Sequence, residues 1–251
     1  MDLIAPDWRD LPANVGALTT TRRGGVSHGR YDDGHGGGGL NLGDHVGDRA
    51  EDVAQNRSLL QASLTAQPIW LSQVHGNRVI DAQPAAERQQ ADASIAVAPG
   101  VACAILSADC LPVLLCDTAG RIVGVAHAGW RGLADGILQN TVAHMQAAGA
   151  GDLLAWLGPA IGPEQFEVGQ DVWDAFVGLD ANACSAFVAL PDRPGKYLAD
   201  IYHLARQILA KAGVGTVYGG EFCTVSDTKR FYSYRRDGVT GRMASLIWLK
   251  S

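Results

Sequence analysis

The sequence of 251 residues lacks the features that would send a chain into a membrane or through a secretory pathway. Its N-terminus does not show the basic and then apolar order of a signal peptide. The most apolar stretch, residues 95–116, is interrupted by two prolines, a glycine and an aspartate, so it is typical of buried strands rather than of a membrane span. We therefore expect a cytoplasmic protein with no membrane partner.

Cysteine is scarce, and basic residues are not in excess. Five cysteines, an odd number, predict reduced thiols rather than a framework of disulfides. The formal net charge of −6 does not favour nonspecific binding to nucleic acid or to an anionic membrane. We expect a small-molecule substrate, no nucleic-acid partner, and a monomer or small homo-oligomer.

No internal repeat and no clear linker occurs, so residues 1–251 are expected to form a single catalytic domain with a sizeable core. A capping box of Asp48 and Glu51 is expected to start the first helix. The predicted helices are 48–63, 133–149, 169–177 and 198–212, and the predicted strands are 15–21, 68–74, 101–107, 111–116, 121–126, 153–157, 214–218 and 244–248. Because strands and helices are mixed without strict alternation, we predict an α/β (α+β) layered sandwich with mixed sheets.

Two of these apolar runs flank the turn at residues 117–120, which predicts a β-hairpin. With a two-residue loop, 118–119, or a four-residue loop, 117–120, Cys110 lies directly opposite His127. Directly opposed residues have Cβ atoms about 4.5–5.5 Å apart, which suits two ligands of one metal ion. A three-residue loop would instead place the two side chains on opposite faces of the sheet.

His75 is the best candidate for a third ligand, because it ends a predicted strand and precedes Gly76, which permits a sharp turn. One cysteine and two histidines are a donor set typical of zinc, and three protein ligands leave one coordination position open, as in catalytic zinc sites. Zinc in such a site lowers the pKa of bound water to about 7, and so supplies a nucleophile or a Lewis acid at neutral pH.

The same residues allow other interpretations. A lone buried cysteine is commonly part of the core, a histidine at a strand end is commonly a surface residue, and no CxxC or HExxH pattern is present. Cys110 could also be a thiol nucleophile, with His127 as its base and Asp109 or another carboxylate as the group that orients the base. The second histidine favours the metal. Asp109 is then a candidate general base or, preferably, a hydrogen-bond acceptor that supports a ligand.

Six motifs in this sequence resemble those of the YfiH family, which has been described as multicopper polyphenol oxidase (laccase), purine nucleoside phosphorylase and peptidoglycan editing factor. The motifs occupy residues 40–48, 72–76, 107–115, 125–132, 158–163 and 231–242. The resemblance implies a zinc ion held by His75, Cys110 and His127. It also implies a layered α/β fold related to the catalytic domain of cytotoxic necrotizing factor.

The resemblance further implies a zinc-dependent purine nucleoside phosphorylase that acts on adenosine, inosine and methylthioadenosine and has adenosine deaminase activity. The alternatives are a peptidoglycan precursor editing hydrolase that acts on UDP-MurNAc-serine and a copper polyphenol oxidase. Many relatives carry cysteines where this chain has Glu164 and Gln165, so a second metal is not expected there and copper is less favoured than zinc.

Phosphorolysis requires an anion site beside the nucleoside. Arg131 opens a predicted helix, whose N-terminus would add to such a site, and Arg235 lies in a loop with two tyrosines. Each arginine also has a plainer interpretation, as a surface salt bridge or as solvation of a loop. Gln73 and Asn41 are expected to hydrogen-bond the substrate or to brace the loops that carry the ligands.

Overall fold

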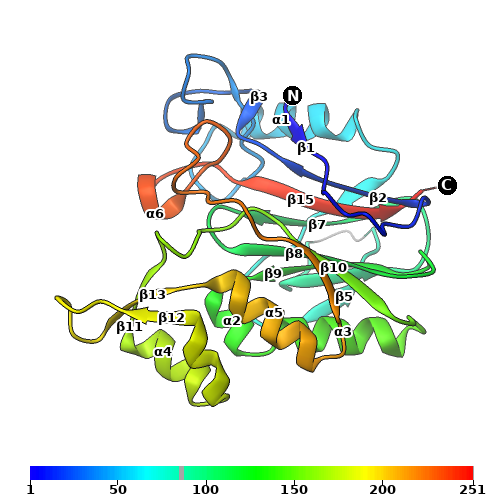
Figure 1. The fold of residues 1–251 in the computed structure, drawn as a ribbon. Coiled ribbons are helices and arrows are strands. Elements are labelled where there is room, and N and C mark those ends of the chain that lie inside the picture. The colour runs from blue at the N-terminus through cyan, green and yellow to red at the C-terminus, as the bar shows by residue number, and fades with distance from the viewer. Residues whose placement is uncertain (85–87, 251) are drawn as a thin grey trace.

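Two β-sheets packed face to face form the centre of the computed structural model, which describes residues 1–84 and 88–250 (Figure 1). The five-stranded sheet has the order β1 (Leu3–Ile4), β2 (Val15–Thr20), β15 (Met243–Leu249), β7 (Val101–Ser107) and β4 (Gln67–Ile69). The six-stranded sheet has the order β14 (Thr216–Gly219), β10 (Leu153–Leu157), β8 (Leu111–Asp117), β9 (Val123–Ala128), β6 (Ala93–Ala96) and β5 (Val79–Asp81). Both sheets combine parallel and antiparallel pairs, which confirms the predicted layered sandwich with mixed sheets.

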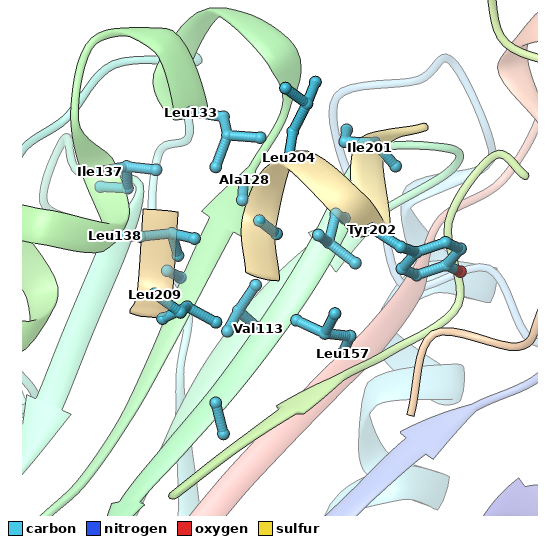
Figure 2. Packing of buried hydrophobic residues seen from close by; sticks show 14 of the residues in the cluster. Val113, Ala128, Leu133, Ile137, Leu138, Leu157, Ile201, Tyr202, Leu204 and Leu209 are labelled. Atoms are coloured by element: carbon cyan, nitrogen blue, oxygen red, sulfur yellow. The ribbon is translucent and has the colours of Figure 1, made fainter. Parts of the chain in front are cut away.

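Helices cover the outer faces of the two sheets. Helix α1 (Ala50–Gln61) packs on the five-stranded sheet, and α3 (Ile137–Ala147) and α5 (Ile201–Lys211) pack on the six-stranded sheet. Figure 2 shows Leu138 and Leu209 of these helices in one apolar cluster with strand residues. Each fully buried leucine contributes about 1.5–3 kcal/mol, so the helices hold the sheets in place mainly through apolar burial. Within the described residues, none of the helices has the length and apolar character to span a bilayer.

A third, smaller sheet was not predicted from the sequence. It contains β11 (Glu167–Gly169), β13 (Lys196–Ala199) and β12 (Phe187–Ala189), and it lies beside α4 (Gln170–Val177) and the 3-10 helix η2 (Ala181–Ala186) (Figure 1). The remaining short elements are β3 (Arg23–Ser27), η1 (Gly29–Tyr31), α2 (Trp130–Ala134) and α6 (Tyr234–Asp237). The predicted helix 198–212 begins at residue 201, because strand β13 extends to residue 199 and Asp200 caps the helix.

Three local predictions were wrong for identifiable reasons. The predicted helix 133–149 is divided into α2 and α3, because Gly136 adopts a φ of 91° between them. The predicted capping box does not form: the Asp48 side chain accepts hydrogen bonds from Ser27 and Asn41 instead. Of the predicted strand 68–74, only the part within β4 (Gln67–Ile69) forms a strand, and the residues after it form a loop that leads to His75.

The hairpin of β8 and β9 forms, but its register differs by two residues from the prediction. Leu111 pairs with Ala128, and the Asp117 carboxylate accepts the backbone N–H groups of Arg121 and Ile122. The loop therefore comprises residues 118–121, one residue later than the predicted four-residue loop. Because the shift is an even number of residues, each side chain keeps its predicted face of the sheet.

Candidate metal centre and active site

His75, Cys110 and His127 come together at one edge of the sandwich. Cys110 immediately precedes β8, His127 lies near the end of β9, and His75 lies in the loop that follows β4. One potential ligand atom from each residue lies within 4.8 Å of the others, and the two imidazole rings meet edge to face. Across residues 1–84 and 88–250, this is the only group of three or more histidine, cysteine or acidic side chains close enough to share a metal ion.

The corrected hairpin register explains how Cys110 reaches His127. Cys110 lies beside Gly129 rather than opposite His127, so the two ligands are diagonal neighbours on one face. A Cβ atom on residue 129 would lie only 2.9 Å from the Cys110 sulfur. Glycine at this position therefore leaves the space that the thiol occupies.

Asp92, which the sequence analysis missed, organises two of the three candidate ligands. Its fully buried carboxylate accepts the backbone N–H groups of Val74, His75 and Gly76 at 3.1, 3.0 and 2.8 Å. It also lies 2.8 Å from Nδ1 of His127. The only indication of this role in the sequence is that Asp92 is a single charged residue between two alanines, both of which are buried in the structure.

The backbone of His75 is strained, with a φ of 60°. A non-glycine residue in such a sparsely populated conformation costs about 1–3 kcal/mol and persists only where the surroundings enforce it. The three N–H bonds to Asp92 provide that enforcement, since they fix the peptide groups on both sides of His75. In this enforced conformation the His75 ring lies beside Cys110.

The electrostatics of the cluster favour the form of cysteine that binds metals. Burial would raise the pKa of Cys110, but the adjacent His127 and His75 lower it to about 6. Burial would lower the pKa of His127, but the Cys110 thiolate and the Asp92 carboxylate raise it to about 9. At neutral pH the metal-free pair is thus a thiolate and an imidazolium, and thiolate is the form of cysteine that coordinates metals.

The donor set fits a metal ion of the zinc type. The hydrogen bond between Asp92 and Nδ1 of His127 leaves Nε2 as the ring nitrogen that is free to coordinate a metal ion. Metal-binding histidines commonly donate a hydrogen bond from their second ring nitrogen to a carboxylate, which fixes the orientation of the ring and raises its basicity. One thiolate and two imidazoles complete a set of three ligands, with room for a substrate atom.

Two cavities meet at His75 and Cys110, and His127 lines the first of them. The first, of about 430 Å³, is here called the Arg242 cavity, and its walls include Gln73, His45 and Tyr234. The second, of about 290 Å³, is here called the Trp130 cavity. Its walls include Phe166, Ile161, Ile201, Arg131, Arg235 and Asp109. Cys110, His75, Ala108 and Tyr234 line both cavities.

The predicted polar residues Gln73 and Asn41 have different positions. Gln73 lines the Arg242 cavity, but its side-chain amide forms two hydrogen bonds with the backbone of Leu106 at the end of β7. Asn41 is fully buried and lines neither cavity. Its Oδ1 accepts the backbone N–H groups of Gly43 and Arg242, so Asn41 braces the wall of the Arg242 cavity.

The two predicted arginines line the Trp130 cavity and are exposed. The guanidinium of Arg131 lies 4.4 Å from the centre of the Trp130 ring. Arg235 donates to the carbonyl oxygens of Gln165 and Glu167.

Asp109 lies beside the cluster but does not orient a histidine, since that bond belongs to Asp92. Its carboxylate accepts the hydroxyl of Thr224 at 2.5 Å and the backbone N–H of Arg235 at 2.6 Å. The backbone φ of Asp109 is 91°, so this residue is also strained. Asp109 thereby ties helix α6 to the strand that begins after Cys110.

Known proteins of similar sequence cover almost the whole chain. Residues 16–250 match a family described as multi-copper polyphenol oxidoreductase laccase. The chain is 53% identical over 247 residues to a purine nucleoside phosphorylase of Pseudomonas aeruginosa, and 98% of each chain is covered. It is 51% identical over 251 residues to the purine nucleoside phosphorylase YfiH of Escherichia coli K12, again with 98% of each chain covered.

Solved structures show the same fold. A Neisseria meningitidis protein of the DUF152 family superposes with a TM-score of 0.93 at 50% identity, and all of both chains is covered. The YfiH protein of Bacillus licheniformis superposes with a TM-score of 0.86 at 31% identity, covering 94% of this chain and 93% of that one. On this similarity of sequence and fold, the chain belongs to the YfiH family, whose domain is described as multi-copper polyphenol oxidoreductase laccase.

Proposed function

We propose that this protein is a zinc-dependent purine nucleoside phosphorylase that acts on adenosine, inosine and methylthioadenosine and also deaminates adenosine. The observation that carries the proposal is a cluster of three candidate ligands that lies between two cavities of different chemistry. Phosphorolysis needs such an arrangement, because a nucleoside and an anion must meet at one point. The names of the relatives from Pseudomonas aeruginosa and Escherichia coli support the same reaction.

His75, Cys110 and His127 are the residues that would hold the zinc ion. When bound, the ion supplies a Lewis acid that stabilises negative charge developing on a substrate atom. Asp92 holds two of the ligands in place before the substrate arrives, so little reorganisation is needed during the reaction. The walls of the two cavities exclude part of the solvent and bring the reactants into contact.

In phosphorolysis, a phosphate oxygen forms a bond to C1′ of the sugar while the bond from C1′ to the base nitrogen breaks. The electron pair of that bond stays on the base, which takes up a proton, and the sugar leaves as its 1-phosphate. Because the sugar carries positive charge in the transition state, a negatively charged nucleophile close to C1′ stabilises it. The task of the chain is therefore to hold phosphate and nucleoside side by side.

Copper is the competing metal, because a set of two histidines and one cysteine also occurs in mononuclear copper sites and the family description names copper. Two observations favour zinc. The described residues bring together one such cluster, whereas a multicopper enzyme needs several metal centres. Among the residues that the structure describes, no methionine lines either cavity to provide the weak axial ligand usual in blue copper sites.

The test is metal analysis of the purified protein together with inosine and adenosine assays on the same sample, with and without phosphate. We expect close to one zinc per chain and release of hypoxanthine from inosine only when phosphate is present. His75→Ala should lose both the zinc and the activity. His144→Ala is the matched control, since this half-exposed histidine pairs with Asp81 and belongs to neither cavity.

Oxygen uptake with a phenol and a blue absorption band, without phosphate-dependent release of base, would contradict the proposal. Cleavage of a muramyl-serine amide without turnover of nucleosides would also contradict it. Full activity in His75→Ala would show that the cluster is not the centre of the reaction.

A further inference from the structure

We propose that Arg242 is the phosphate-binding residue of this site, so that phosphate occupies the Arg242 cavity and the nucleoside base occupies the Trp130 cavity. This assignment rests on the proposed phosphorolysis and gives each cavity one reactant. Arg242 is the last residue of the motif at residues 231–242, and the sequence pattern points to Arg131 and Arg235 for the anion instead.

The guanidinium of Arg242 presents a free edge for an anion. Its Nη1 donates to the carbonyl oxygens of Thr240 and Gly241 at 3.0 Å each. Within residues 1–84 and 88–250, no hydrogen bond engages its Nε or Nη2. These two atoms form the side of the guanidinium that binds two oxygens of a phosphate at once.

The negative groups that act on Arg242 are the Cys110 thiolate, which is a candidate zinc ligand, and the Asp109 carboxylate, and neither forms a salt bridge or hydrogen bond with it in the described part of the chain. No carboxylate lies within salt-bridge distance of Arg242 in the described part of the chain, and none lines the Arg242 cavity. The side chain is only partly exposed, and burial lowers the pKa of this arginine from its ordinary value. A guanidinium that is shielded from water and has no carboxylate in salt-bridge contact attracts an anion more strongly than an exposed one does.

The Trp130 cavity has the properties of a base-binding site rather than a phosphate site. Its apolar walls include Trp130, Phe166 and Ile201. Its two arginines are exposed, and the guanidinium of Arg131 lies against the Trp130 ring. Arg235 donates from Nη1 to carbonyl oxygens, as Arg242 does, so exposure to solvent is what distinguishes Arg235 from Arg242. Flat aromatic and apolar surfaces suit a purine, which has two large faces and few charges.

The motif at residues 40–48 holds Arg242 in position. The Oδ1 atom of Asn41 accepts the backbone N–H of Arg242 at 2.9 Å, and the backbone N–H of Leu42 donates to the Arg242 carbonyl at 3.1 Å. Gly43 packs against the stem of the arginine, since a Cβ there would lie 2.8 Å from Cγ of Arg242. The backbone and the stem are thus fixed while the edge of the guanidinium stays free.

The experiment compares Arg242→Gln and Arg242→Lys with the wild-type protein, all loaded with zinc. The KM for phosphate in inosine phosphorolysis should rise about 10- to 100-fold in Arg242→Gln, the range expected from losing charge-assisted hydrogen bonds. The KM for inosine and the zinc content should stay within about twofold of the wild-type values. Arg242→Lys should fall between the two, because lysine keeps the charge but loses the two-pronged edge.

A binding measurement without nucleoside separates this inference from the proposed reaction. Inorganic phosphate titrated into each protein by calorimetry should bind the wild type and lose most of its affinity in Arg242→Gln. Arg121→Gln is the matched control, because this exposed arginine lies at the hairpin loop and lines neither cavity. The zinc content of each variant and its thermal unfolding verify that it is folded.

If the wild type binds phosphate through Arg242 but does not cleave nucleosides, the proposed reaction fails and the anion site stands. If the wild type needs phosphate for cleavage but Arg242→Gln keeps the wild-type phosphate KM and affinity, the inference is overturned and the proposed reaction stands. Loss of phosphate affinity in Arg235→Gln or Arg131→Gln, with none in Arg242→Gln, would overturn it by placing the anion in the other cavity.

Discussion

Replacing Asp92 by asparagine is the sharpest test of how the cluster is held together. In the wild-type protein one carboxylate oxygen lies 3.0 Å from the His75 N–H and 2.8 Å from Nδ1 of His127. The other oxygen accepts the N–H groups of Val74 and Gly76. Asparagine keeps the shape of the side chain but has only one oxygen. In either orientation its NH₂ group faces two donors, so two hydrogen bonds are lost.

The magnitude follows from these four bonds. A hydrogen bond to a charged group contributes about 1.5–3 kcal/mol, so losing two costs about 3–6 kcal/mol of folding free energy. For a chain of this size that loss lowers the melting temperature by about 6–24 °C. The affinity for zinc should fall about 10- to 100-fold, the usual effect of removing a partner of a metal-binding histidine. We expect the upper end, because Asp92 holds two ligands rather than one.

The assay is zinc binding by competition with a chromophoric chelator, with thermal unfolding of the metal-free and zinc-loaded proteins measured in parallel. Asp117→Asn is the control, since Asp117 is equally buried but accepts the backbone N–H groups of Arg121 and Ile122 with a single oxygen at the far end of the hairpin. It should keep the wild-type affinity for zinc. A folded Asp92→Asn protein with wild-type zinc affinity would refute the argument that this carboxylate positions the ligands.

Two further predictions concern the cysteine of the cluster. In metal-free protein, iodoacetamide should alkylate Cys110 at a rate that is nearly constant above pH 7 and falls as the pH drops through about 6, because its lowered pKa keeps it as thiolate above that point. Peptide mass spectrometry measures this rate, bound zinc should suppress it, and Cys103, whose pKa burial raises to about 12, should stay unmodified. Gly129→Ala should weaken zinc binding by at least tenfold, because its Cβ would lie 2.9 Å from the Cys110 sulfur. Gly215→Ala, where a Cβ meets nothing within 4 Å, is the control, and equal zinc affinities in the two alanine variants would contradict the close approach seen at residue 129.

The buried strands were the most predictable part of the fold. Strand β10 has the predicted ends, and β7 also matches, because a strand covered on both faces reads as a continuous apolar run between polar residues. The three-stranded sheet was missed because β11 and β12 have three residues each and carry no pattern of their own. The division of the predicted helix at Gly136 depends on one backbone conformation, which residue type permits but does not require.

The three candidate ligands could be predicted even though part of the reasoning was inaccurate. The predicted hairpin had the wrong loop, but an even shift of register kept Cys110 and His127 on one face. Asp92 could not be found this way, since it lies 35 residues from His127 and a single aspartate carries no periodic signal. Arg242 was equally hidden, because its proposed role depends on having no carboxylate within salt-bridge distance in the described part of the chain, which only the tertiary structure reveals.

The structure separates residues that meet the cavities from residues that hold them. Asn41 lines neither cavity, yet its side chain fixes the backbone of Arg242. Asp109 in the same way fixes the backbone of Arg235, and Asp109 directly precedes the candidate ligand Cys110. Asp109 and His75 are also the two non-glycine residues with positive φ within the described ranges. Strain of this kind persists only where hydrogen bonds enforce it, and here a buried carboxylate provides them in both cases. The motifs of this sequence therefore contain few residues that line the cavities and many that hold those residues in place. A substitution at one of the supporting residues should change the geometry of the site before it changes the fold.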